Sequence, residues 1–175
     1  VATGEAAGTT GGQVQMAGNI VGVVGGGTVD VSGDKGGGEA LIGGNYLGAN
    51  TTSIVDGAPV ANAQVTVVGV GSSVKANAKT SGDGGRVILW SEGTTRMNGA
   101  VEARGGAVSG NGGFVETSSR GALGVQGSVD ASAGNSKGAL GTWLLDPADV
   151  TISAAADSGT TVVGTDYYAT ANTGS

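Results

Sequence analysis

Gly84-Gly85-Arg86-Val87-Ile88-Leu89-Trp90-Ser91 contains the feature that decides the fold, a pair of glycines followed by one residue and a valine. The step recurs, once with alanine in place of valine, at Gly11-Gly12-Gln13-Val14, Gly37-Gly38-Glu39-Ala40 and Gly112-Gly113-Phe114-Val115. The second glycines stand at 12, 38, 85 and 113, which are 26, 47 and 28 residues apart. Because the middle gap is close to two of the others, we expect one more, eroded copy between Gly57 and Gln64.

A second element follows the glycine step. It reads valine, a polar residue and then a small apolar residue, at Val29-Asp30-Val31, Val74-Lys75-Ala76, Val101-Glu102-Ala103 and Val129-Asp130-Ala131. In three units it begins 16 or 17 residues after the second glycine. Apolar and polar residues alternate within each unit, which is the periodicity of a β-strand. A unit of this length cannot bury its apolar face alone, so the pattern predicts strands stacked coil upon coil.

We therefore predict an all-β fold, a parallel β-helix or β-solenoid, over residues 1–152, with about six to seven coils spaced by about 4.8 Å. Val, Ile, Leu and Ala are expected to point inward, and polar residues outward. Asn50 to Pro59 is expected to form a loop or a wider coil. Residues 153–175, rich in Ala, Thr and Gly, are expected to form an irregular tail, an extra coil or a linker. An up-and-down antiparallel barrel or sandwich is the alternative, and its hairpin turns would be Asp56-Gly57, Asp83-Gly84 and Asn111-Gly112.

The composition excludes several classes of function. The formal net charge of −6 argues against nucleic acid as a partner, because such affinity comes mainly from Lys and Arg. The chain has no histidine and no cysteine, so Ser-His-Asp sites, Cys-His sites and most zinc sites are impossible. No apolar run approaches the roughly 20 residues of a membrane span, and no signal peptide is visible at Val1. Neither end carries a polar capping unit, so we expect a piece of a longer polypeptide or a subunit that stacks end to end.

Four stretches carry a resemblance to a known family. They are Gly37-Gly38-Glu39-Ala40-Leu41-Ile42-Gly43-Gly44, Gly82 to Ser91, Gly110 to Ser118, and Gly141-Thr142-Trp143-Leu144-Leu145-Asp146-Pro147. From about Gly11 to Ile152 the chain resembles bacterial exoproteins of the filamentous haemagglutinin type, which are exported by two-partner secretion. The resemblance implies a right-handed parallel β-helix, an extracellular or cell-surface location, and a role in adhesion, aggregation or biofilm matrix. It implies no catalytic residue, and the family's N-terminal secretion domain is not recognised in these residues.

Few residues are candidates for chemistry. Asp30, Glu102 and Asp130 share one repeat position with Lys75 and are expected to form an outward column. The other candidates are Asp146 and Asp149 in a turn, Asp56 and Asp83 as calcium ligands, Trp90 and Trp143 as packing or sugar-stacking residues, and the pairs Thr51-Thr52, Thr94-Thr95 and Thr160-Thr161 as an ice-binding array. We predict no catalytic, cofactor or metal site.

The predicted function is that of a secreted structural or adhesive solenoid. Its expected partners are further copies of the chain, bound through the end coils, and a cell-surface or polysaccharide ligand. A carbohydrate-active β-helix enzyme that uses the carboxylate column is the first alternative. A passive stalk that presents another domain is the second.

Overall fold

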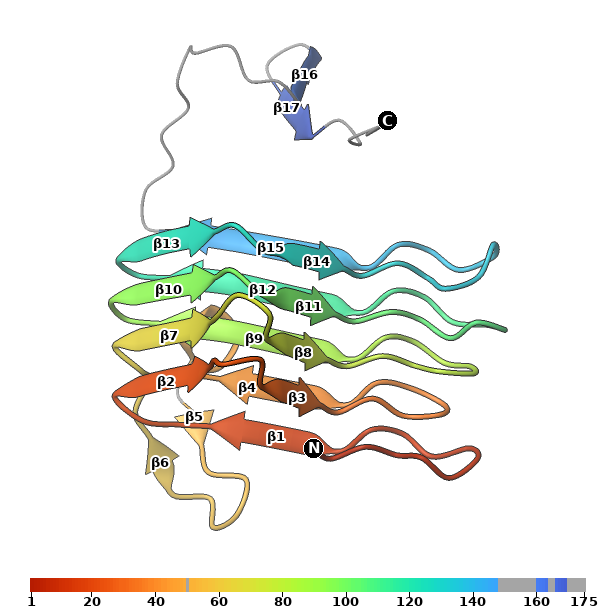
Figure 1. Cartoon of the computed structure of the whole chain (residues 1–175), viewed down its shortest axis with the longest axis horizontal. Coiled ribbons are helices and arrows are strands. Elements are labelled where there is room, and N and C mark those ends of the chain that lie inside the picture. The colour runs from red at the N-terminus through yellow and green to blue at the C-terminus, as the bar shows by residue number, and fades with distance from the viewer. Residues whose placement is uncertain (50, 148–159, 164–165, 170–175) are drawn as a thin grey trace.

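The computed structural model describes residues 1–49, 51–147, 160–163 and 166–169, and its strands build three parallel sheets (Figure 1). The first sheet contains β1 (Gln13–Met16), β4 (Glu39–Ile42), β9 (Arg86–Ser91), β12 (Phe114–Ser119) and β15 (Thr142–Pro147). The second contains β2 (Ile20–Val23), β7 (Val65–Val68), β10 (Thr94–Met97) and β13 (Ala122–Val125). The third contains β3 (Thr28–Asp30), β8 (Ser73–Lys75), β11 (Ala100–Glu102) and β14 (Ser128–Asp130).

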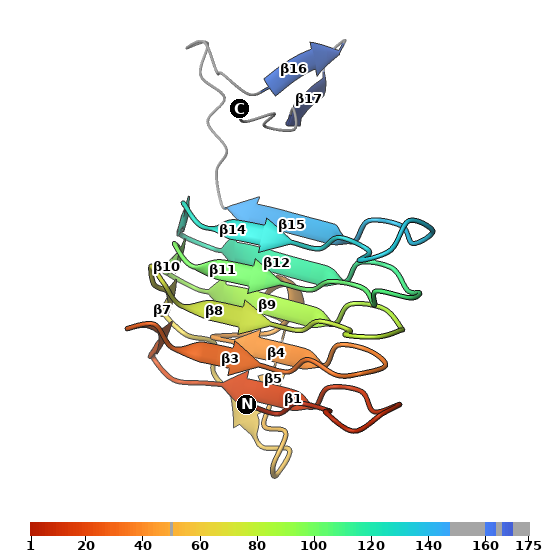
Figure 2. The ribbon, with the colours of Figure 1, turned by 45° about the vertical axis from the view of Figure 1, so that its right-hand side comes forward.

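Each circuit of the chain adds one strand to each sheet in the same order, as Figure 2 shows from a second side. Coil 1 is β1, β2 and β3; coil 2 is β4, β7 and β8; coil 3 is β9, β10 and β11; coil 4 is β12, β13 and β14; coil 5 begins with β15. Arg86 pairs with Glu39 on one side and with Phe114 on the other, and Phe114 pairs in turn with Thr142. The parallel ladders confirm the predicted β-solenoid, and the antiparallel barrel or sandwich is wrong. The right-handed sense stays a prediction.

The predicted number of six to seven coils is wrong for the described residues, in which the first sheet has five levels. Glu39 of coil 2 pairs directly with Arg86 of coil 3, so the 47-residue gap holds one coil and no eroded copy between Gly57 and Gln64. The extra length is an insertion. The Ala63 N–H donates to the Gly43 carbonyl at 2.6 Å, so the coil closes between these two residues and residues 44–62 leave it.

The insertion contains the 3₁₀ turn η1 (Tyr46–Gly48) and a short antiparallel hairpin, β5 (Thr51–Thr52) and β6 (Pro59–Val60). The expected loop from Asn50 to Pro59 lies within it, although Asn50 itself is outside the described residues. Of the three dipeptides considered as hairpin turns, Asp56-Gly57 does lie between β5 and β6. The other two lie in the long connections between the third and the first sheet. We call residues 44–62 the strap.

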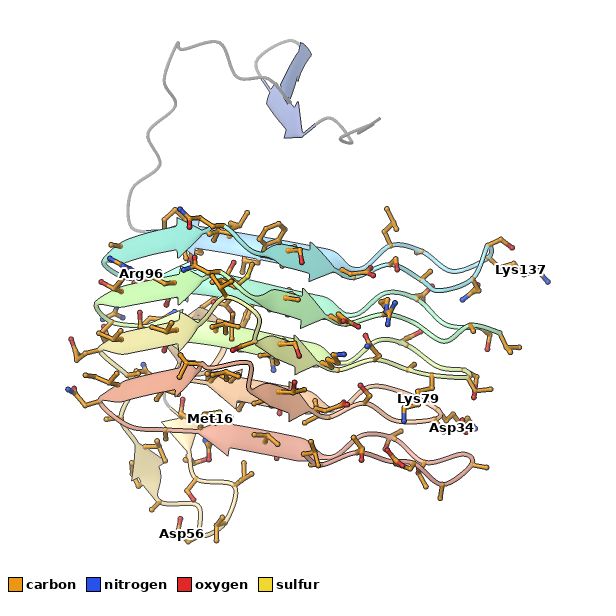
Figure 3. The ribbon with its side chains drawn as sticks, viewed as in Figure 1. Met16, Asp34, Asp56, Lys79, Arg96 and Lys137 are labelled. Atoms are coloured by element: carbon orange, nitrogen blue, oxygen red, sulfur yellow. The ribbon has the colours of Figure 1, made fainter. Side chains whose placement is uncertain are left out.

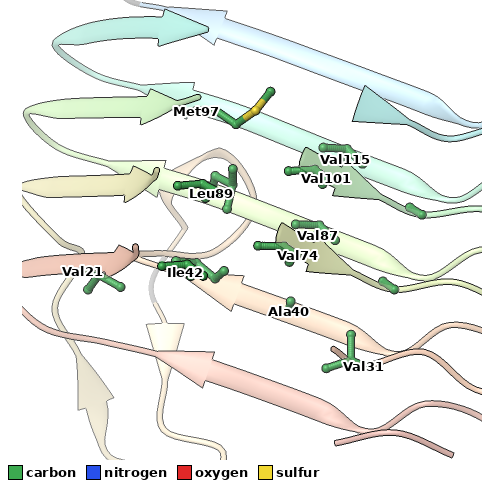
Figure 4. Packing of buried hydrophobic residues seen from close by; sticks show 14 of the residues in the cluster. Val21, Val31, Ala40, Ile42, Val74, Val87, Leu89, Met97, Val101 and Val115 are labelled. Carbon is green, nitrogen blue, oxygen red and sulfur yellow. The ribbon is translucent and has the colours of Figure 1, made fainter. Parts of the chain in front are cut away.

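The hydrophobic core is a thin column inside the stack. Successive coils contribute one or two aliphatic side chains from each sheet, and Figure 4 shows how these line up. Val74, Val87, Val101 and Val115 are each no more than 1% exposed. The predicted inward direction of Val, Ile, Leu and Ala therefore holds for this column.

Polar side chains also point into the stack, at the corner where the first sheet passes into the second. Thr95 donates to the carbonyl of Ser118 at 2.8 Å, and Thr66 donates to the carbonyl of Trp90 at 2.8 Å. The Ser91 hydroxyl lies 2.8 Å from that of Thr95. The hydroxyls of Thr66, Ser91 and Thr95 therefore each have a hydrogen-bond partner, as buried polar groups usually do.

The Gly-Gly steps lie where neighbouring coils come closest. The second glycine of a step donates its N–H to the carbonyl of the residue that ends the preceding Val-x-Ala element, as in Gly85 to Ala76 and Gly113 to Ala103, both at 2.7 Å. A Cβ atom on Gly113 would lie 2.2 Å from the carbonyl oxygen of Gly85 in the coil below. The glycines are therefore required by close backbone approach.

Beyond coil 5 the structure describes one antiparallel pair, β16 (Thr160–Val163) with β17 (Asp166–Ala169). This pair falls inside the segment 153–175 that the sequence separates from the solenoid. The boundary at residue 152 lies outside the described residues, so it stays a prediction.

We predict that Gly113→Ala destabilises the solenoid, because its Cβ meets a backbone carbonyl that side-chain rotation cannot move. Overpacking of this kind costs about 2–3 kcal/mol, which corresponds to a fall of roughly 4–12 °C in the thermal midpoint. Gly124→Ala in the same coil is the control, since its Cβ meets only the Arg96 side chain, at 3.9 Å. Thermal unfolding followed by circular dichroism should show less than about 0.5 kcal/mol of change for the control. Equal effects of the two substitutions would contradict the steric explanation.

Candidate functional site

The column predicted from the repeat exists on the outer face of the third sheet. Asp30 pairs with Lys75, Lys75 with Glu102, and Glu102 with Asp130 in the ladder of β3, β8, β11 and β14. The Lys75 ammonium lies 3.8 Å from the Glu102 carboxylate. A cation therefore separates two of the acidic residues, as the sequence suggested.

A second column, two residues further along each strand, completes the charge balance. Arg104 contacts Glu102 at 2.9 Å and Asp130 at 3.8 Å, so its guanidinium lies between the two carboxylates. The Asn77 amide donates to Glu102 at 2.8 Å and accepts the Arg104 N–H at 2.8 Å. These groups are only partly buried, and exposed ion pairs of this kind contribute about 0.2–1 kcal/mol each. The surface is a network of mutually paired charges.

The first sheet has apolar side chains on its outer face as well as its inner face. Leu41, Ile88 and Trp90 form a second buried cluster there, and Phe114 packs against it. In β9 only Arg86 is even partly exposed, so the strand does not show the expected alternation of buried and exposed residues. The strap covers this outer face, which is why both sides of β9 are dry.

Trp90 is 3% exposed and lies under the 3₁₀ turn η1 of the strap. A Cβ on Gly48 would lie 2.2 Å from the indole ring, so the turn rests directly on it. Tyr46 meets the edge of the Phe114 ring at a centroid distance of 5.7 Å, and the Arg86 guanidinium lies 5.3 Å from the Tyr46 ring centre. The packing interpretation of Trp90 is therefore correct, and its ring face is not open to a sugar.

Glu116 is fully buried on this outer face, and no sequence motif singles it out. Both of its carboxylate oxygens accept the backbone N–H of Leu47, at 3.1 and 3.3 Å. Burial raises the pKa of the Glu116 carboxyl, although this hydrogen bond and the charge of Arg86 oppose the shift. The contact joins the strap to coil 4. A run of apolar residues without alternation, Val87 to Trp90, was the signal that something covers this face.

The remaining candidates are placed apart. Trp143 occupies the inward register position of Val115, is 38% exposed, and donates its indole N–H to the Thr117 hydroxyl at 2.9 Å.

Asp146 is exposed on β15, while Asp149 lies outside the described residues. Asp56 lies at the hairpin tip (Figure 3), and Asp83 accepts the Asn111 N–H in another loop. Thr95 is buried, so the threonine pairs do not form an exposed array.

No group of three or more potential metal ligands occurs among the described residues. Asp56 already accepts the Ala58 N–H at 3.1 Å, and hydrogen bonds from Ser53 and Ala58 lower its pKa. No helix in the described part of the chain is long and apolar enough to cross a membrane.

Comparison with known proteins gives a likeness to a solved structure. No protein-family model matches the chain, and no curated protein matches it. Among solved structures, the chain is similar to the HMW1 secretion domain from Haemophilus influenzae, with 29% sequence identity and a TM-score of 0.56. The likeness covers 78% of this chain and 32% of that one, so the chain corresponds to about a third of that domain. The matched structure is a secretion domain, although no secretion domain is recognised in the sequence of this chain.

We predict that Glu116→Gln changes the pH dependence of stability. In the unfolded chain Glu116 loses its proton at its ordinary pKa, whereas in the folded chain it keeps the proton to higher pH. The folded state binds more protons in that window, so the contribution of this group to stability falls as pH rises through it. Thermal midpoints of the variant minus those of the native chain should therefore increase between about pH 4 and pH 7.5. A difference that is constant with pH would contradict the assignment, and Asp130→Asn serves as an exposed control.

Proposed function

We propose that this chain is part of a secreted bacterial β-solenoid of the two-partner-secretion, adhesin-like type, which acts as a structural or adhesive element. The observation that carries the proposal is the parallel solenoid with its 29% identity to a bacterial secretion domain over 78% of the chain. The motifs that resemble filamentous haemagglutinin-type exoproteins lie in and next to the strands of the first sheet of this solenoid. They provide the Gly-Gly steps of β4, β9 and β12 and the Trp143 strand β15.

The proposal includes an extracellular or cell-surface location and no enzymatic activity. Two facts support the second part. The chain has no histidine or cysteine, which leaves carboxylates as the main candidates for acid–base chemistry. The carboxylates that the fold brings together, Glu102 and Asp130, share the Arg104 guanidinium between them. Either carboxyl group could act as a general acid only after losing its contact with Arg104.

Self-association through the end coils is the second element of the proposal. Within the described residues, β1 and β2 have no strand on one side, and β13, β14 and β15 have none on the other, whereas the Ala2 N–H already donates to the Asp30 carbonyl of β3 at 2.8 Å. Such strand edges can pair with another chain. Leu145 stands at an inward register position in coil 5 and is 47% exposed. A second copy stacked on coil 5 would cover it and continue the ladders, and a head-to-tail contact of this kind need not close.

We predict that Leu145→Lys prevents end-to-end association, because an inward-pointing charge on an edge strand opposes pairing. Leu140→Lys is a closely matched control: Leu140 is 80% exposed and lies in the connection before β15, off the ladder. Sedimentation velocity at increasing concentration should show association for the native chain and for the control, and monomers for Leu145→Lys. A native chain that stays monomeric at about 10 mg/ml, together with filament-free electron micrographs, would rule this element out.

The location and the adhesive role have a separate test in cells of the source bacterium. An antibody against the purified chain should label intact cells or the culture supernatant, and purified chain should inhibit attachment of those cells to surfaces. Labelling confined to the cytoplasm would contradict the proposal. Surface labelling without any inhibition would favour the passive stalk. Cleavage of acidic polysaccharides that is lost in Asp130→Asn would favour the enzyme.

A further inference from the structure

We propose that the strap is a clamp that joins coils 1 to 4 into one cooperative unit, so that the rod resists unravelling coil by coil. The reason begins with the solenoid itself. Each coil contacts only its neighbours, so an array of this kind can lose its coils one after another from an end. A segment that contacts coils far apart in the stack couples their unfolding.

The first arm of the strap reaches from coil 2 across coil 3 to coil 4. It leaves β4 at Gly43, lies over Trp90 of coil 3, and ends in the Leu47 N–H that the Glu116 carboxylate of coil 4 accepts. Leu47 has φ 53°, an uncommon conformation for a residue with a side chain, and its N–H points to Glu116 from this strained turn. This carboxylate is buried, so separating coil 4 from the strap would remove its hydrogen bond from the Leu47 N–H.

The second arm reaches in the opposite direction, to coil 1. The Gln15 side chain of β1 donates to the Thr52 carbonyl at 2.9 Å and accepts the Ile54 N–H at 3.0 Å. One side-chain amide therefore holds the end of β5 and the start of the turn that follows it. The labels of Met16 and Asp56 in Figure 3 show that the hairpin tip extends past the level of β1.

The base of the strap is closed as well. The Asn62 amide donates to the Gly48 carbonyl at 3.1 Å, which ties the end of the strap to its first arm. Together with the bond from Ala63 to Gly43, it makes the strap a closed loop fixed at coil 2. The contacts at Gln15 and Glu116 then lie on both sides of that anchor, and four coils share one segment. Coil 5 has no contact of this kind among the described hydrogen bonds.

Hydrogen exchange measured by mass spectrometry on the whole chain tests the clamp. In the native chain, peptides from β4, β9 and β12 should have protection factors within about threefold of one another, and β15 should exchange faster. In the double variant Gln15→Ala, Glu116→Ala, the protection of β12 should fall at least about tenfold below that of β9. Val115→Ala, a core substitution in the same strand as Glu116, is the matched control. It should lower the protection factors of β4, β9 and β12 together, because it destabilises the unit without uncoupling its coils.

The proposal is overturned if the double variant lowers the protection factors of all three strands together, as the control does. It is also overturned if the protection factors in the native chain already differ tenfold along the stack. Should the double variant fail to fold, Gln15→Ala alone decides the question. Gln15 is only partly buried in the first coil. Its replacement should lower the protection factor of β1 about tenfold relative to that of β4. Unchanged relative protection of β1 would then contradict the clamp.

Discussion

The whole structure depends on how closely the backbone of one coil approaches the next at the Gly-Gly steps. There the N–H of Gly85 closes a coil onto Ala76, while the same residue lies against Gly38 of the coil below. The two repeated elements of the sequence, the glycine step and the Val-x-Ala element, are thus the two sides of one hydrogen-bonded junction. A side chain at this point would clash with the backbone of the neighbouring coil and destabilise the stack. The core can be thin because this contact sets the spacing.

The strap shows how a repeated fold accommodates a segment that does not repeat. The coil closes beneath it through Gly43 and Ala63, so register continues from Glu39 to Arg86 as though the insertion were absent. The inserted residues then use the outer face of the first sheet as a second packing surface. Apolar residues that would otherwise be exposed, Ile88 and Trp90, become buried there. In the described residues, buried hydrophobic clusters therefore lie on both sides of the same strands.

Much of the fold could be predicted from the sequence, because stacking converts a sequence period directly into a spatial column. The positions of Asp30, Lys75, Glu102 and Asp130 follow from counting residues between glycines, and the structure confirms them. The predicted number of coils was wrong because a gap of 47 residues can hold either two ordinary repeats or one repeat and an insertion. Glu116 and Leu47 could not be paired in advance, since they are 69 residues apart and belong to no common repeat position. The unbroken apolar run in β9 was the one local hint that its outer face is covered.

In the described residues the solenoid has five levels, and residues 39 and 86 lie one coil apart. The chain has no cysteine, so spin labels can be attached at Gln13→Cys and Thr142→Cys, the exposed first residues of β1 and β15. These positions are separated by four coil steps, or about 19 Å between backbones at about 4.8 Å a step. Double electron–electron resonance should give one narrow distribution compatible with that separation. A separation about 5 Å longer, as an extra coil would produce, or a broad distribution would contradict the account.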